Sequence, residues 1–306
     1  MKKIAILILL LLNVTACTGT KVPPPMLERP PAKISLALGG GAARGFAHIG
    51  VIKALEAQGI SPDIIVGTSA GSVVGALYAA GYNGFQIQEL SMSMEEDQLI
   101  DGSGITRCIV ETMITDKRGC IKGQALQDFI NRNVKGRPIE NLNKTFAAVA
   151  TNLSSGEMMV FQTGNTGAAV RASSSVPVFF QPVTINARDY VDGGLVTPVP
   201  VSVARTLGAD FVIAVDISDR PQDRTTAGIV DILWQTFTIF GQTINRYELP
   251  KADVIIRPVT YGIPATDMSG RNIAVLEGEK AVAAILPELK AKLAILNETR
   301  HVAGMR

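Results

Sequence analysis

The sequence predicts an α/β protein whose mostly parallel central sheet is sandwiched between helices. Short apolar runs alternate with stretches of helical spacing: residues 34–38 precede 46–58, and 63–66 precede 69–80. Strands that are apolar throughout are typical of parallel sheets covered on both faces. Apolar residues make up 47% of the 306 residues, enough for a large core, and charged residues only 18%. That composition argues against a disordered or nucleic-acid-binding chain.

The remaining elements follow the same alternation. Apolar positions three and four residues apart indicate helices, and short β-branched runs bounded by turn residues indicate strands. Residues 95–122 interrupt the pattern because they are polar and aperiodic, which is typical of a functional loop, a lid or disorder. We expect helices at 85–94, 123–134, 166–174, 199–207 and 272–296, strands at 145–152, 158–161, 211–216 and 254–256, and a short hairpin at 183–192.

Residues 226–247 form a further helical stretch that is rich in large apolar side chains. Apolar residues at helical spacing usually face a core, so we expect a core helix. A membrane-facing or acyl-lining helix is the alternative.

The first residues have the layout of a secretory signal peptide. Lys2 and Lys3 precede an unbroken apolar run at 4–12, which is too short to span a bilayer comfortably, since that takes about 20 residues. Val14-Thr15-Ala16-Cys17 then resembles the lipobox of bacterial lipoproteins, in which the cysteine is lipidated and becomes the new N-terminus. The alternative is an ordinary signal peptide followed by an incidental cysteine.

The lipobox sets the expected organisation and address of the chain. Residues 1–16 would be the signal peptide, 17–32 the lipidated Cys17 with a Pro-rich tether, 33–217 the domain core, and 218–306 a helical extension packed on the same domain. Because Thr18 rather than Asp follows the cysteine, we expect a lipid-anchored protein of the cell envelope, at the outer membrane facing the periplasm. Removal of two lysines leaves 27 basic and 27 acidic residues, so attachment would depend on acyl chains such as palmitate.

Two further cysteines, Cys108 and Cys120, lie within the irregular segment. A location outside the cytoplasm permits a disulfide between them, which would stabilise the fold by about 3 kcal/mol in the chain-entropy model. Two unpaired thiols are the alternative.

The pentapeptide Gly67-Thr68-Ser69-Ala70-Gly71 has the pattern G-x-S-x-G. It directly follows a predicted strand and opens a predicted helix, which is the setting of a nucleophile elbow. There Ser69 would project above the sheet, Gly67 and Gly71 would leave room for neighbouring backbone, and the helix N-terminus would favour a developing negative charge. The alternative is an ordinary turn with Ser69 as helix N-cap.

A glycine-rich segment, Gly39-Gly40-Gly41-Ala42-Ala43-Arg44-Gly45, follows the first strand. Its N–H groups would suit an oxyanion hole, because consecutive glycines expose backbone donors close to a substrate. Arg44 would add positive charge or fix the loop. A plain tight turn is one alternative. A dinucleotide loop is another, but its third glycine would fall on Arg44.

The base is the remaining question, since the chain has only two histidines. His48 precedes the serine and suits a structural role or positioning of the glycine loop, and His301 lies in the C-terminal tail. Asp192-Gly193-Gly194 is the best candidate, with Asp192 contacting the Ser69 hydroxyl directly and desolvation raising the pKa of its carboxyl. A hairpin turn is the alternative for this tripeptide.

Together, and in this order, the glycine loop, the elbow and Asp192-Gly193-Gly194 resemble the patatin-like phospholipases. The chain is similar to the bacterial branch related to the neuropathy target esterase domain, over about residues 34–217. The resemblance implies a three-layer hydrolase with a Ser69–Asp192 dyad and an oxyanion hole at Gly39, Gly40 and Gly41. It also implies hydrolysis of phospholipid or lysophospholipid esters with no metal or cofactor. The rival hypotheses are a catalytically silent lipid-binding lipoprotein and a nucleotide-binding oxidoreductase.

Overall fold

The computed structural model describes residues 31–93, 118–223, 227–263 and 268–304. Eight strands form one sheet in this part of the chain: β1 (Ile34–Leu38), β2 (Ile64–Thr68), β3 (Thr145–Asn152), β4 (Met158–Phe161), β5 (Val183–Ile185), β6 (Arg188–Asp192), β7 (Phe211–Val215) and β8 (Val254–Ile256). The α-helices are α1 (Phe46–Ala57), α2 (Ala70–Ala79), α3 (Gly84–Met92), α5 (Gln124–Asn133), α6 (Thr166–Ser173), α7 (Val201–Thr206), α8 (Ile229–Glu248) and α9 (Arg271–Gly304).

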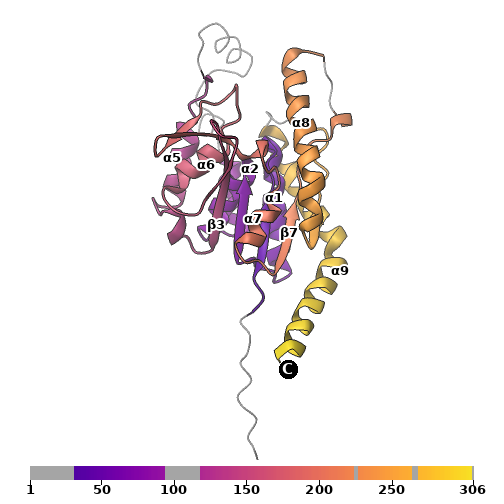
Figure 1. Ribbon diagram of the computed structural model, residues 1–306. Helices are drawn as coiled ribbons and strands as arrows, with labels where there is room; N and C mark the ends of the chain where they lie inside the picture. The colour runs from indigo at the N-terminus through magenta and orange to yellow at the C-terminus, as the bar shows by residue number, and fades with distance from the viewer. Residues whose placement is uncertain (1–30, 94–117, 224–226, 264–267, 305–306) are drawn as a thin grey trace, which may run out of the picture.

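The sheet has the strand order β5-β6-β3-β2-β1-β7-β8, with β4 also paired to β3. The five strands from β3 to β8 in this order run parallel. Strands β4 and β6 add to β3 in antiparallel sense, and β5 with β6 forms the expected hairpin. The predicted α/β class and the layered arrangement are therefore confirmed (Figure 1).

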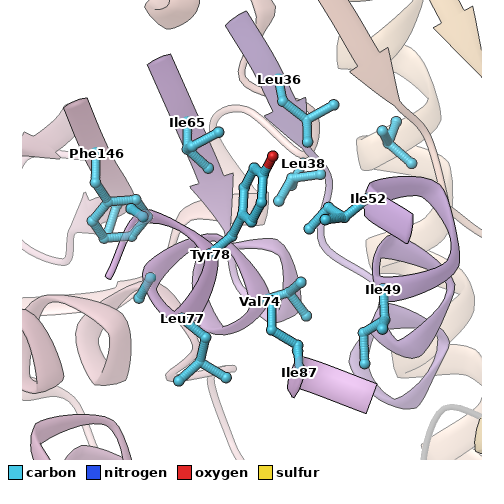
Figure 2. Packing of buried hydrophobic residues seen from close by; sticks show 14 of the residues in the cluster. Leu36, Leu38, Ile49, Ile52, Ile65, Val74, Leu77, Tyr78, Ile87 and Phe146 are labelled. Atoms are coloured by element: carbon cyan, nitrogen blue, oxygen red, sulfur yellow. The ribbon is translucent and has the colours of Figure 1, made fainter. Parts of the chain in front are cut away.

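Helices cover both faces of the sheet, which explains why its strands are apolar throughout. In β1, Leu36 and Leu38 pack into one core with α1 and α2, whereas Ala37 between them packs into a second core with α7. This alternation follows from the two-residue period of a strand. Figure 2 shows the first core, where Phe146 of β3 and Leu77 of α2 lie among the aliphatic side chains.

The two C-terminal helices differ in how they use their apolar residues. Helix α9 buries Val275, Val282 and Leu289, spaced two turns apart, in the core shared with α1. Helix α8 leaves Phe240 58% exposed and Tyr247 74% exposed. The expectation of a core helix at 226–247 is thus wrong for the face of α8 that carries these two residues, and Phe240 lines a cavity instead. No helix within the described ranges is both long and apolar enough to cross a bilayer.

Several predictions concern residues outside the described ranges. They include the signal peptide at 1–16, Cys17 with most of its tether, and Cys108 with most of the irregular segment. Cys120 is described, and it is disulfide-bonded. Its pairing with Cys108 stays a prediction.

Candidate active site

The sheet brings Ser69 and Asp192 to the same place through β3. Strand β2 runs parallel to β3 and ends where Thr68 pairs with Val149. Strand β6 runs antiparallel to β3 and ends where Asp192 pairs with Ala150, the next residue along β3. Strands β2 and β6 flank β3 on opposite sides and run in opposite directions, and their C-terminal ends lie beside two consecutive residues of β3. Ser69 directly follows the end of β2, so it lies near Asp192.

Ser69 occupies a strained turn between β2 and α2. Its backbone has φ 53° and ψ −123°, a conformation that a residue with a side chain adopts only when its surroundings impose it. A Cβ on Gly71 would lie 2.1 Å from the carbonyl oxygen of Leu38, and one on Gly67 would lie 2.4 Å from the Cα of Ser72. These contacts explain why the elbow needs both glycines, and they lock the serine in its strained geometry.

A hydrogen bond from outside the elbow also holds Ser69. Its N–H donates to the hydroxyl of Ser173, at the end of α6, over 2.9 Å, and Ser69 itself is only 9% exposed. The carbonyl of Ser69 accepts the Ser72 hydroxyl at 2.7 Å within the first turn of α2. The side chain of Ser69 is left to face the cavity at the N-terminal, partially positive end of this helix.

Asp192 is buried at the end of β6, with 6% of its surface exposed. Its Oδ1 accepts the N–H of Gly194 at 2.7 Å. Its Oδ2 is buried and has no hydrogen-bond partner of regular geometry among the described residues. Desolvation raises the pKa of Asp192 to about 6, against the opposing effects of a side-chain hydrogen bond with Ser69 and the Gly194 N–H. The contact with Ser69 is therefore loose, and hydrogen bonds in enzyme active sites are often poorly aligned before substrate binds.

The backbone around Asp192 fixes the direction of the carboxylate. The carbonyl oxygen of Asp192 accepts a hydrogen bond from the hydroxyl of Thr151 on β3 at 2.8 Å. The backbone N–H of Asp192 donates to the carbonyl oxygen of Ser175 over 2.9 Å. A Cβ on Gly193 would lie 2.2 Å from the carbonyl oxygen of Val149, so only glycine allows this approach to β3. The Asp-Gly-Gly sequence is therefore more than a hairpin turn, since it holds the aspartate against β3, the strand that also pairs with β2.

The glycine loop provides fewer free donors than the sequence suggested. The N–H groups of Gly39 and Gly40 already donate to the carbonyls of Val215 and Pro198, each over 3.0 Å. Gly41 and Ala42 line the cavity beside Ser69, and within the described part of the chain their N–H groups donate to no protein acceptor. Of the predicted oxyanion-hole glycines, Gly41 therefore keeps a free N–H group beside Ser69, and Ala42 has one that the sequence did not suggest.

His48 and Arg44 hold this loop in place. His48 is fully buried, and its Nε2 lies 2.7 Å from the carbonyl oxygen of Gly39. Burial lowers the pKa of His48 to about 4, so the ring is neutral and Nε2–H donates to this carbonyl. Arg44 donates from Nε to the carbonyl of Gly41 at 3.1 Å and forms an ion pair with Asp219. The suggested loop-positioning role of His48 agrees with this geometry.

A cavity of about 140 Å³ joins these groups. Its floor contains Ser69, Asp192 and the glycine loop, and α8 forms one wall. Trp234 and Phe237 of that wall are in edge contact with each other, and Trp234 also stacks on Phe179. The wall beside the serine is thus apolar and aromatic, as a site for an acyl chain requires. Among the described residues, no cluster of three or more His, Cys, Asp or Glu side chains is arranged to hold a metal ion.

A strained serine on a strand–turn–helix elbow, with a buried acid and a glycine loop beside it, is the arrangement of a serine hydrolase. The family model described as Patatin-like phospholipase matches residues 36–205. The chain belongs to the patatin-like phospholipase family.

Relatives with curated names extend this result. Patatin-like phospholipase domain-containing protein 6 of Homo sapiens is 33% identical over 202 residues, which cover 64% of this chain and 14% of that protein. An uncharacterized NTE family protein of Mycobacterium tuberculosis is 35% identical over 186 residues, or 61% of this chain and 49% of that protein. Lysophospholipase NTE1 of Meyerozyma guilliermondii is 32% identical over 214 residues, which cover 70% of this chain and 14% of that protein. The chain thus spans less than half of each relative.

The fold has a counterpart among solved structures. VipD from Legionella pneumophila superposes with a TM-score of 0.52 at 17% sequence identity, over 85% of this chain and 68% of that one. At this identity the likeness concerns the fold alone.

Three residues of the site had no assigned role in the sequence analysis. Ser173 holds the elbow N–H, Ala42 offers a free N–H, and Asp219 pairs with Arg44. Ala42 has φ 51°, a conformation unusual for alanine, and no local sequence pattern reports it. Ser173 and Asp219 lie more than a hundred residues from their partners, so only the tertiary fold reveals them.

Proposed function

We propose that this chain is a serine acyl-ester hydrolase that acts on phospholipids or lysophospholipids through Ser69 and Asp192. The observation that carries the proposal is the head-to-head meeting of β2 and β6 on β3, which presents the two side chains to one cavity. Membership of the patatin-like phospholipase family supports the substrate class, as does the name of the fungal relative, a lysophospholipase.

The chemistry follows from the positions of the groups. The Asp192 carboxylate accepts the proton of the Ser69 hydroxyl while Oγ attacks the ester carbonyl carbon. The N–H groups of Gly41 and Ala42 stabilise the oxyanion that forms, and one such donor typically accelerates the reaction by a factor of 10² to 10³. Protonated Asp192 then returns its proton to the leaving alcohol. Water attacks the acyl-serine with Asp192 as base, which regenerates both residues.

A serine paired directly with an aspartate needs a more basic carboxylate than water allows. Near neutral pH, proton transfer is favoured when the pKa of the base lies close to the pH. Burial supplies this for Asp192, whose pKa rises to about 6. His48 does not replace it, because its neutral ring is buried and bonded to the carbonyl of Gly39.

A fluorophosphonate probe tests the serine directly. We expect labelling of the wild-type chain and none of Ser69→Ala, while Ser154→Ala on the exposed β3–β4 turn labels normally. Asp192→Asn should lose most turnover of a lysophospholipid. Binding of fatty acyl ligands without labelling or turnover would instead identify a catalytically silent lipid-binding protein.

We further propose that Cys17 is lipidated and anchors the chain in the outer membrane, with the domain facing the periplasm. The lipobox at residues 14–17 and the Pro-rich tether support this address. Labelling of cells with radioactive palmitate should mark the wild-type chain but not Cys17→Ser. A chain that stays unlabelled, or fractionates with the soluble periplasm, would contradict the anchor.

A further inference from the structure

A second cleft of about 620 Å³ opens beside the cavity that contains Ser69. The two share Ser218, Asp219 and Gln242 in their linings, so they are neighbouring compartments of one site. The lining of this cleft is more polar than that of the aromatic cavity, and it includes the three arginines Arg220, Arg246 and Arg257.

Two of these arginines, Arg220 and Arg246, have no counter-ion among the described residues. Both acids of the cleft are already paired, Asp219 with Arg44 and Asp216 with Arg257 at 3.4 Å. In the part of the chain that the structure describes, the guanidinium groups of Arg220 and Arg246 make neither a hydrogen bond nor an ion pair. The cleft therefore has a surplus of positive charge next to the reaction centre.

A buried amide in the same lining is also incompletely bonded. Asn245 is only 4% exposed, and its Nδ2 donates to the hydroxyl of Ser218 over 3.1 Å. Its Oδ1 is buried and has no partner among the described residues. A buried acceptor without a partner destabilises the site, so binding is favoured when a ligand donates to this oxygen.

Helix α8 orders these features along its length. Trp234 and Phe237, in its first half, line the cavity that contains the serine. Gln242 lies at the boundary, and Asn245 and Arg246, one turn further on, line the cleft. Residues three and four apart share one helix face, so a single face of α8 changes from aromatic to cationic.

We propose that the cleft binds the phosphate of the substrate headgroup, with Arg220 and Arg246 on the anion and Asn245 Oδ1 accepting a glycerol hydroxyl. The inference rests on the proposed function and adds the substrate class, a glycerophospholipid. Arginine suits this task, because its planar fork of N–H donors matches phosphate oxygens. The acyl chain then lies along the aromatic half of α8 while the ester carbonyl reaches Ser69.

Headgroup selectivity tests the assignment. The purified full chain is assayed with a lysophosphatidylcholine and with a neutral monoacylglycerol of the same acyl chain, and the ratio of the two kcat/KM values is compared between variants. We expect Arg246→Gln and Arg220→Gln each to lower this ratio about tenfold and the double variant to lower it further, since each variant removes a charged hydrogen bond to the phosphate. Arg132→Gln removes the same charge from exposed α5, away from the cleft, and leaves the ratio unchanged.

The outcomes separate this inference from the proposed function. Failure of the wild-type chain to hydrolyse either ester would overturn the proposed function itself. Hydrolysis of both esters with an unchanged ratio in the double variant would overturn the headgroup site alone, as would an equal loss on both substrates. Inorganic phosphate distinguishes a free anion from a lipid: submillimolar inhibition of monoacylglycerol hydrolysis in the wild type, absent from the double variant, would also overturn the headgroup assignment.

Discussion

Replacing Asp192 by Asn should remove most turnover and at the same time stabilise the protein at neutral pH. Burial raises the pKa of this carboxyl from 3.8 to about 6, so the folded state holds the Asp192 carboxylate at a cost. A shift of one pKa unit corresponds to about 1.36 kcal/mol. Above about pH 6 the raised pKa of Asp192 therefore lowers the free energy of unfolding by about 3 kcal/mol. Asparagine is neutral and carries no such penalty.

The sign of the effect depends on pH. Because the folded-state pKa is the higher one, the native chain binds more protons than the unfolded chain between these two values. The contribution of Asp192 to stability is then present below pH 3.8 and lost as pH rises through about 6. The stability advantage of Asp192→Asn over wild type should grow by about 2.5 kcal/mol between about pH 4 and about pH 8.

Denaturant unfolding of both proteins at the two pH values measures this difference. Comparing the pH dependence removes the changes in hydrogen bonding that the amide itself introduces. Ser69→Ala is the matched control, because it keeps the carboxyl and should keep the pH dependence. A stability difference between Asp192→Asn and wild type that is equal at both pH values would refute the desolvated base. So would a wild-type kcat/KM that stays flat on acidification, instead of falling with a midpoint near 6.

Three further substitutions test how the site is held. Gly71→Ala should destabilise the chain by more than about 2 kcal/mol, because its Cβ would lie 2.1 Å from backbone, whereas Gly75→Ala in the same helix meets a side chain at 3.1 Å and should lose less; thermal unfolding compares them. Ser173→Ala removes the acceptor of the elbow N–H, so we expect kcat to fall about tenfold with KM unchanged, and a change in KM alone would contradict a positioning role. His48→Phe should lower the free energy of unfolding by about 1–3 kcal/mol. It should leave the acid limb of the pH–rate profile in place, because an imidazole with a pKa of about 4 is already neutral near pH 6. A displaced limb would assign the titration to the histidine.

The backbone geometry of the two candidate catalytic motifs was predictable because each motif depends on local contacts. The G-x-S-x-G elbow needs small residues within two positions of the serine, and Asp192-Gly193-Gly194 needs glycine where β3 comes closest. The donors of the oxyanion hole were less predictable. Whether the N–H of Gly39 or Gly40 is free depends on the carbonyls of Val215 and Pro198, which come from distant parts of the chain. Helix α8 was misjudged for a similar reason, since an apolar spacing does not say whether a core or a cavity faces it.

Chemistry and specificity reside in different layers of this protein. The sheet fixes the positions of the proposed catalytic residues Ser69 and Asp192, since Thr68 and Asp192 pair with consecutive residues of β3. The walls that meet the rest of the substrate come from α8 and the segment after β7, outside the family match at 36–205. Substitutions in those walls should therefore change which ester is cleaved more than how it is cleaved. This division agrees with the general rule that a rigid scaffold positions the reaction while peripheral elements choose the ligand.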